Sequence, residues 1–85
     1  MSQATEVYSR EFDAVLLNLT ARIRSQVEAK IEDLGSRLAA YPHHRLQGRS
    51  EYRLRAGDYR IIYDFDQQQN ILYLLTLGNR REIYR

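Results

Sequence analysis

The chain of 85 residues contains no cysteine, and this absence excludes disulfide bonds, thiolate metal sites and a cysteine nucleophile together. Its four glycines, at positions 35, 48, 57 and 78, form neither a phosphate-binding loop nor a dinucleotide fingerprint. The longest mainly apolar run, residues 71–77, is far shorter than the ~20 residues that span a bilayer. The N-terminus lacks the cationic and apolar pattern of a signal peptide, so we expect a cytoplasmic protein.

Lysine is also scarce, since Lys30 is the only one among 13 cationic side chains and the other 12 are arginines. Arginine binds a phosphate through two parallel hydrogen bonds, whereas lysine acts as a point charge. Residues 1–42 hold five cations and six acids, but residues 43–85 hold eight arginines and five acids. Positive charge is therefore concentrated in the C-terminal half, where tyrosine is also frequent, and that combination is one mark of a nucleic-acid surface.

Two helices are predicted in the N-terminal half of one small domain that covers residues 1–85. A short strand is expected at residues 4–9. Apolar residues then recur at helical spacing, with Ser9 placed to cap the first helix and Thr20 placed to start a longer second one. Pro42 is expected to end the second helix, because residues before proline are disfavoured in the helical conformation.

The C-terminal half predicts strands, because the apolar period changes from 3.6 to 2 after a polar loop at residues 43–49. Alternation marks residues 52–56 and 59–66, which a tight turn at glycine 57 separates. The run at 71–77 is apolar on both faces and predicts a central strand that Gly78 breaks. The order β-α-α-β-β-β indicates an α+β fold in which two helices pack on a small antiparallel sheet.

The arginines of these strands form a candidate site. Parity places Arg53 and Arg55 on the face opposite the apolar residues of their strand, and Arg60 and Arg80 follow on neighbouring strands or strand ends. One patch of guanidinium groups can stabilise the charge that develops on a phosphate attacked by a neighbouring 2′-hydroxyl. Tyr84 is the candidate for proton transfer or for stacking on a base. The alternative is that the arginines line a solvated face and Tyr84 packs on the core.

The pair His43-His44 precedes Arg45 in the predicted loop. Adjacent histidines do not by themselves build a tetrahedral metal site. A solvated or RNA-facing loop is favoured here over metal binding or a catalytic histidine.

Several segments of the C-terminal half resemble the RelE toxins of the RelE/ParE superfamily. They are Leu-Gln-Gly at residues 46–48, YRLRAGDYRIIY at residues 52–63 and GNRREIYR at residues 78–85. The string LRAGDYRIIY is specific for the superfamily, and the terminal segment favours RelE over ParE. The two predicted helices are compatible with this resemblance, which covers about half of the chain strongly.

The resemblance implies a ribosome-dependent endoribonuclease, the toxin of a type II toxin–antitoxin system. Such toxins enter the ribosomal A site and cut messenger RNA by attack of the 2′-hydroxyl, which leaves a 2′,3′-cyclic phosphate. They use no metal or other cofactor, and a RelB-like antitoxin silences them. A ParE-like toxin that inhibits DNA gyrase without catalysis is the alternative, and a relative that only binds its antitoxin is a third.

The resemblance also assigns roles by motif. Arg60 and Arg80 correspond to arginines that hold the scissile phosphate, and Tyr84 corresponds to the C-terminal tyrosine of the family. Arg53 and Arg55 stand where the family often has lysines, so this chain departs from the pattern in side chains that bind the RNA backbone. Because arginine does not lose its proton, neither can act as a general base. Three further arginines are expected to contact RNA phosphates, Arg45, Arg49 and Arg81.

Overall fold

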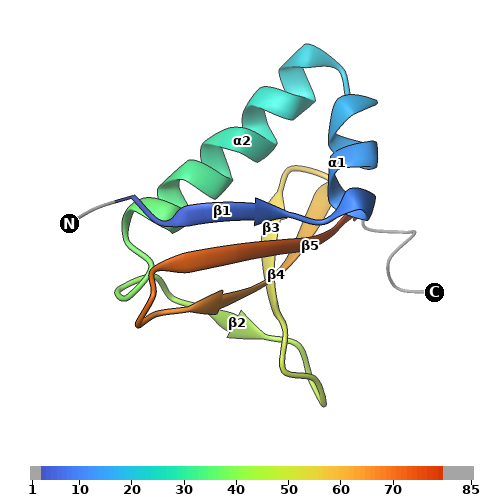
Figure 1. Cartoon of the computed structure of the whole chain (residues 1–85). Helices are drawn as coiled ribbons and strands as arrows, with labels where there is room; N and C mark the ends of the chain where they lie inside the picture. The colour runs from blue at the N-terminus through green and yellow to red at the C-terminus, as the bar shows by residue number, and fades with distance from the viewer. Residues whose placement is uncertain (1–2, 80–85) are drawn as a thin grey trace.

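The structure is a computed structural model that describes residues 3–79, which form two helices and one five-stranded sheet. The elements in chain order are β1 (Thr5–Tyr8), α1 (Arg10–Leu17), α2 (Ala21–Ser36), β2 (His44–Arg45), β3 (Tyr52–Ala56), β4 (Tyr59–Asp66) and β5 (Ile71–Asn79). The strands lie side by side in the order β1-β5-β4-β3-β2, and both helices lie on one side of the sheet (Figure 1). The predicted α+β class and helical pair are confirmed.

The two helices begin at the capping residues that the sequence indicates. The Ser9 hydroxyl accepts a hydrogen bond of 3.0 Å from the backbone N–H of Phe12, and the Thr20 hydroxyl accepts one of 3.4 Å from that of Ile23. The Ser9 hydroxyl also donates to the Leu75 carbonyl in β5 at 2.6 Å. The cap of α1 is thereby fixed to the middle of the sheet.

The hairpins predicted from the period of 2 are confirmed. β3 pairs antiparallel with β4 across a turn in which Gly57 has a φ of +61°, a value that glycine adopts without strain. β4 pairs antiparallel with β5, which lies between β4 and β1 as its two apolar faces indicate.

Other parts of the sheet differ from the prediction. β1 pairs with β5 in parallel, so the sheet is mixed rather than antiparallel throughout. Hairpin patterns relate only consecutive strands, and β1 is separated from its partner by most of the chain. The expected loop at residues 43–49 contains the short strand β2, whose two polar, exposed residues carry no apolar alternation. β5 continues through Gly78 to Asn79, which pairs with Tyr59, so the glycine lies within the strand.

The second helix also ends earlier than predicted. α2 stops at Ser36, and residues 37–40 form a turn rather than a further helical turn up to Pro42. Leu38 is nevertheless buried, because this turn still packs against the core. Within residues 3–79, neither helix is long and apolar enough to cross a membrane.

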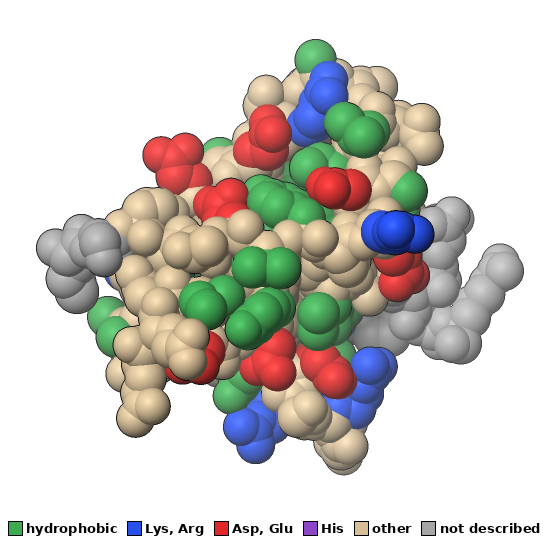
Figure 2. Space-filling model, in the orientation of Figure 1, with side chains coloured by type: hydrophobic (Ala, Val, Ile, Leu, Met, Phe, Trp, Pro, Cys, Tyr) green, Lys and Arg blue, Asp and Glu red, His purple; other side chains and the backbone are tan. Residues whose placement is uncertain are grey.

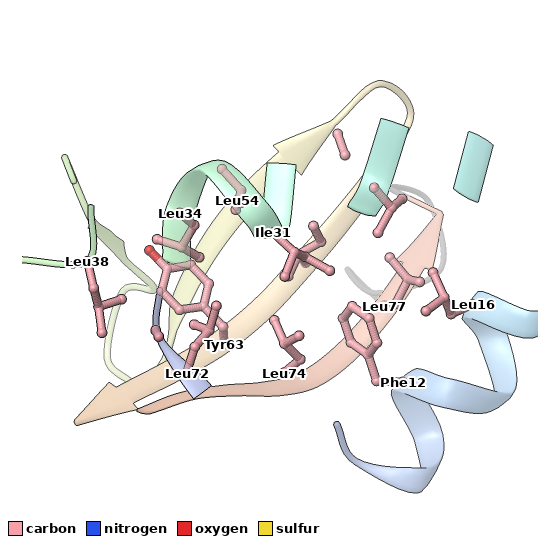
Figure 3. Packing of buried hydrophobic residues seen from close by; sticks show 14 residues of the cluster. Phe12, Leu16, Ile31, Leu34, Leu38, Leu54, Tyr63, Leu72, Leu74 and Leu77 are labelled. Atoms are coloured by element: carbon pink, nitrogen blue, oxygen red, sulfur yellow. The ribbon is translucent and has the colours of Figure 1, made fainter. Parts of the chain in front are cut away.

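The core fills the space between the helices and one face of the sheet. Side chains from α1, α2 and the sheet point toward one another there (Figure 3). The largest fully buried side chains are Tyr63, Phe12, Ile31, Leu34, Ile61, Leu72, Leu74 and Val27. Because both helices cover this face, the opposite face of the sheet is left for the charged side chains of β3 and β4.

Candidate nucleic-acid interface

Three arginines share the face of the sheet that is turned away from the helices. In the register of β3 with β4, Arg53 lies opposite Ile62 and Arg55 lies opposite Arg60. Directly opposed residues project to the same side of a sheet, whereas the intervening Leu54 is buried in the core on the other side. The sheet has one irregularity, between Ile62 and its neighbour at position 63, and it lies beyond these arginines and does not reverse them.

Arg60 lies at the base of this face. It is only 7% exposed, whereas Arg53 and Arg55 are exposed. Its cross-strand neighbours are Arg55 on β3 and Gly78 on β5. Because Gly78 has no side chain, β5 presents none directly opposite Arg60. A buried guanidinium beside two exposed ones produces a positive potential, and this potential favours an anionic ligand.

Two hollows open at these arginines, and Arg53 and Arg60 line both of them. The first has a volume of about 500 Å³ and is also lined by Tyr41, Pro42, His44, Leu54 and Arg55. The second has a volume of about 440 Å³ and is also lined by Leu46, Gln47, Arg49, Ile62 and Thr76. Together they are named the arginine groove. Its size suits a nucleotide, and its combination of arginine with an aromatic ring suits single-stranded RNA.

Of the other arginines expected to contact RNA, Arg49 lines the second hollow, Arg45 does not line the groove, and Arg81 lies outside the described residues. Arg45 is opposite Tyr52, on the core side of β2 and β3, where its guanidinium donates to the Tyr52 hydroxyl at 2.9 Å. The same guanidinium lies 5.3 Å from the centre of the Tyr52 ring. Arg45 is therefore turned away from the three arginines of the groove. Three predicted site residues fall outside residues 3–79, Arg80, Arg81 and Tyr84.

The two adjacent histidines point to opposite sides of β2. His44 is exposed, lies opposite Arg53 and lines the arginine groove. His43 is half-buried and stacks on Phe65 with ring centres 4.1 Å apart. The sequence did not predict that the two histidines face opposite sides, because this follows from the strand conformation at β2, in which successive side chains alternate between the faces.

His43 is held by both of its ring nitrogens. Its Nε2 lies 2.7 Å from the Leu38 carbonyl oxygen, which can only accept, so Nε2 donates. In the neutral ring Nδ1 is then an acceptor, and it lies 2.7 Å from the Tyr63 hydroxyl. Burial raises the pKa of Tyr63, so this hydroxyl keeps the proton that it donates. His43 and Tyr63 thereby fix the start of β2 to the core.

Replacing Tyr63 with phenylalanine is expected to lower the free energy of unfolding by about 1–2 kcal/mol, because His43 Nδ1 loses its donor while the ring packing is kept. Urea denaturation followed by circular dichroism measures this change. Tyr73→Phe is the matched control, since Tyr73 is half-buried on the other face of the sheet. Equal stability loss in the two variants would contradict a specific role for the Tyr63 hydroxyl.

The sequence matches one family model over residues 7–84, and that model describes the ParE toxin of a type II toxin–antitoxin system, parDE. This chain belongs to the RelE/ParE superfamily of type II toxins. The match covers both helices, strands β2 to β5 and the second half of β1, so the superfamily expected from the C-terminal motifs is confirmed. No curated protein sequence matches the chain.

Solved structures of RelE toxins share the fold of this RelE/ParE toxin. The archaeal RelE–RelB complex from Pyrococcus horikoshii OT3 gives a TM-score of 0.77 at 20% identity, with 95% of this chain and 99% of that one covered. The RelBE2 toxin–antitoxin complex from Mycobacterium tuberculosis gives 0.74 at 22% identity, covering 96% and 97%. The isolated E. coli RelE toxin gives 0.74 at 19% identity, covering 95% and 90%. At these identities the likeness establishes the fold alone.

Proposed function

We propose that this toxin is a ribosome-dependent endoribonuclease that cuts messenger RNA in the A site. The observation that carries the proposal is the arginine groove, where Arg53, Arg55 and Arg60 share one open face and Arg60 lies at its base. Attack of a 2′-hydroxyl on the adjacent phosphorus spreads extra negative charge over the phosphate oxygens. Guanidinium groups fixed by a sheet stabilise that charge without reorganising.

The residues of the groove are assigned different roles according to their position. Arg60, at the base, holds the scissile phosphate, and Arg53 and Arg55, at the exposed rim, bind the RNA backbone. The motif resemblance adds Arg80 to the phosphate site and gives Tyr84 proton transfer or base stacking. Arg45 and Arg81 are proposed to contact ribosomal RNA phosphates, and for Arg45 this contact is made from the side of β2 away from the groove.

A RelB-like antitoxin is the proposed partner that silences this activity. The P. horikoshii and M. tuberculosis relatives were solved as toxin–antitoxin complexes. A partner that blocks the arginine groove needs acidic side chains, and a segment that folds on binding can supply them. The side of the molecule that has β1 in front carries acidic side chains over its surface and basic ones toward its margins, so it is a poor match for such a segment (Figure 2).

Purified toxin incubated with ribosomes programmed with a defined messenger RNA tests the proposal, with the same RNA free of ribosomes as the control. We expect cleavage only on the ribosome, with 2′,3′-cyclic phosphate at the new 3′ ends. An intact message in both reactions would contradict the nuclease.

A second candidate function is inhibition of DNA gyrase without catalysis, which the ParE description of the matching family model favours. A gyrase supercoiling assay separates the two functions. The nuclease predicts unchanged supercoiling at toxin concentrations that cut ribosome-bound RNA, whereas a gyrase inhibitor predicts lost supercoiling and unchanged transcript ends in arrested cells.

A further inference from the structure

His44 is the histidine on the wall of the arginine groove. It is the direct cross-strand partner of Arg53, and with Arg53, Arg55 and Arg60 it lines the first hollow of the groove. It is exposed, so its ring is accessible to a bound RNA. The adjacent His43 has both ring nitrogens engaged on the other side of the strand and cannot serve the groove.

Among the described side chains that line the first hollow, His44 is the best suited to accept a proton. Arg53 and Arg55 of β3 and Arg60 of β4 face it and do not release a proton near neutral pH. Tyr41, from the segment before β2, also lines the hollow, and burial raises the pKa of its phenol, which makes it a poorer source of a charged base. Among the described residues that line this hollow there is no carboxylate.

Resting on the proposed nuclease function, we propose that His44 is the general base that activates the 2′-hydroxyl of the RNA. Its neutral imidazole takes the 2′ proton as the 2′ oxygen bonds to phosphorus and the bond from phosphorus to the 5′ oxygen breaks. The departing 5′ oxygen gains a proton from water, and the imidazolium returns its proton to solvent. The products are a 2′,3′-cyclic phosphate and a 5′-hydroxyl, with no net change in protons.

This assignment supplies a function that the arginines of β3 cannot perform. Arginine does not take a proton from a hydroxyl, because its guanidinium stays charged in proteins. The exposed imidazole of His44, directly opposite Arg53 on the neighbouring strand, is placed to take the 2′ proton. Imidazole exchanges protons near neutral pH, which is the range in which a general base is efficient.

Single-turnover cleavage on programmed ribosomes, measured from about pH 5.5 to about pH 8.5, tests the role of His44. We expect the wild-type rate to rise with pH, and we expect His44→Gln to slow cleavage about 10²–10⁴-fold and to remove that rise. Affinity for the programmed ribosome and thermal unfolding are expected to stay near wild-type values, because His44 is exposed. Added imidazole should restore part of the rate of His44→Ala. Gln68→Ala, an exposed change in the turn between β4 and β5, is the control.

Three results would overturn the assignment. Wild-type cleavage rates in both His44 variants would remove His44 from the reaction. An equal loss at every pH, with the pH-dependent rise retained, would make it a binding residue instead. If the wild-type toxin cuts no RNA on the ribosome, the proposed function fails first and the assignment fails with it, so the two failures are distinguishable.

Discussion

Replacing Arg60 with alanine is expected to lower the rate of ribosome-programmed cleavage about 10²–10³-fold and to abolish growth arrest. Arg60 is the guanidinium at the base of the groove, between Arg55 and the side-chain-free Gly78, so no other described cation occupies its place in the sheet. A phosphate in the groove would lose the most deeply buried of its three strand arginines. Single-turnover rates at saturating toxin measure the loss.

Because Arg60 is buried, the variant must be shown to fold before its rate is interpreted. Circular dichroism and thermal unfolding provide that check, and Arg60→Lys keeps the charge while removing the planar fork of donors. Arg22→Ala is the matched control, since Arg22 is an exposed arginine of α2. Full cleavage by a folded Arg60→Ala variant would remove the groove from the mechanism.

Replacing Phe12 with alanine is expected to lower the free energy of unfolding by about 3–5 kcal/mol. Phe12 is 0% exposed, and its ring contacts that of Tyr8 edge to face with centres 5.6 Å apart. The loss removes buried apolar area and leaves a cavity between α1 and β5. A domain of this size has a total stability on the order of 5–10 kcal/mol, so a large fraction of it depends on this side chain.

Urea denaturation of Phe12→Ala gives the change in unfolding free energy directly. Leu17→Ala is the control on the same helix, because Leu17 is 69% exposed, and a change of less than about 0.5 kcal/mol is expected for it. If both variants lost the same stability, the packing of α1 on β5 would not be what holds the helix in place.

Local patterns in the sequence predict much of this fold. Hydroxyl caps at Ser9 and Thr20 mark the helix starts, and strict alternation through β3 and β4 places Arg53 and Arg60 on a common face. These features are predictable because each depends on residues close together in the chain.

Features that depend on distant partners were not predictable in this way. The parallel pairing of β1 with β5 joins strands from opposite ends of the chain, and no local pattern records it. Strand β2 is too short to show a period, so neither the turn of Arg45 away from the groove nor the separation of His43 from His44 followed from the sequence.

The superfamily is established, but it does not by itself decide between an RNA and a gyrase target. The matching family model describes ParE, whereas the solved structures compared above are of RelE toxins. The discrimination therefore depends on chemistry in the groove, where the Arg60 and His44 variants are expected to change cleavage without changing the fold.

His43, immediately before β2, attaches this edge strand to the core, while His44 faces the groove. One imidazole is held by Leu38, Tyr63 and Phe65, and its neighbour is a single peptide bond away in the groove. The wall of the first hollow can therefore stay in place while segment 46–51, which lines only the second hollow, changes in composition.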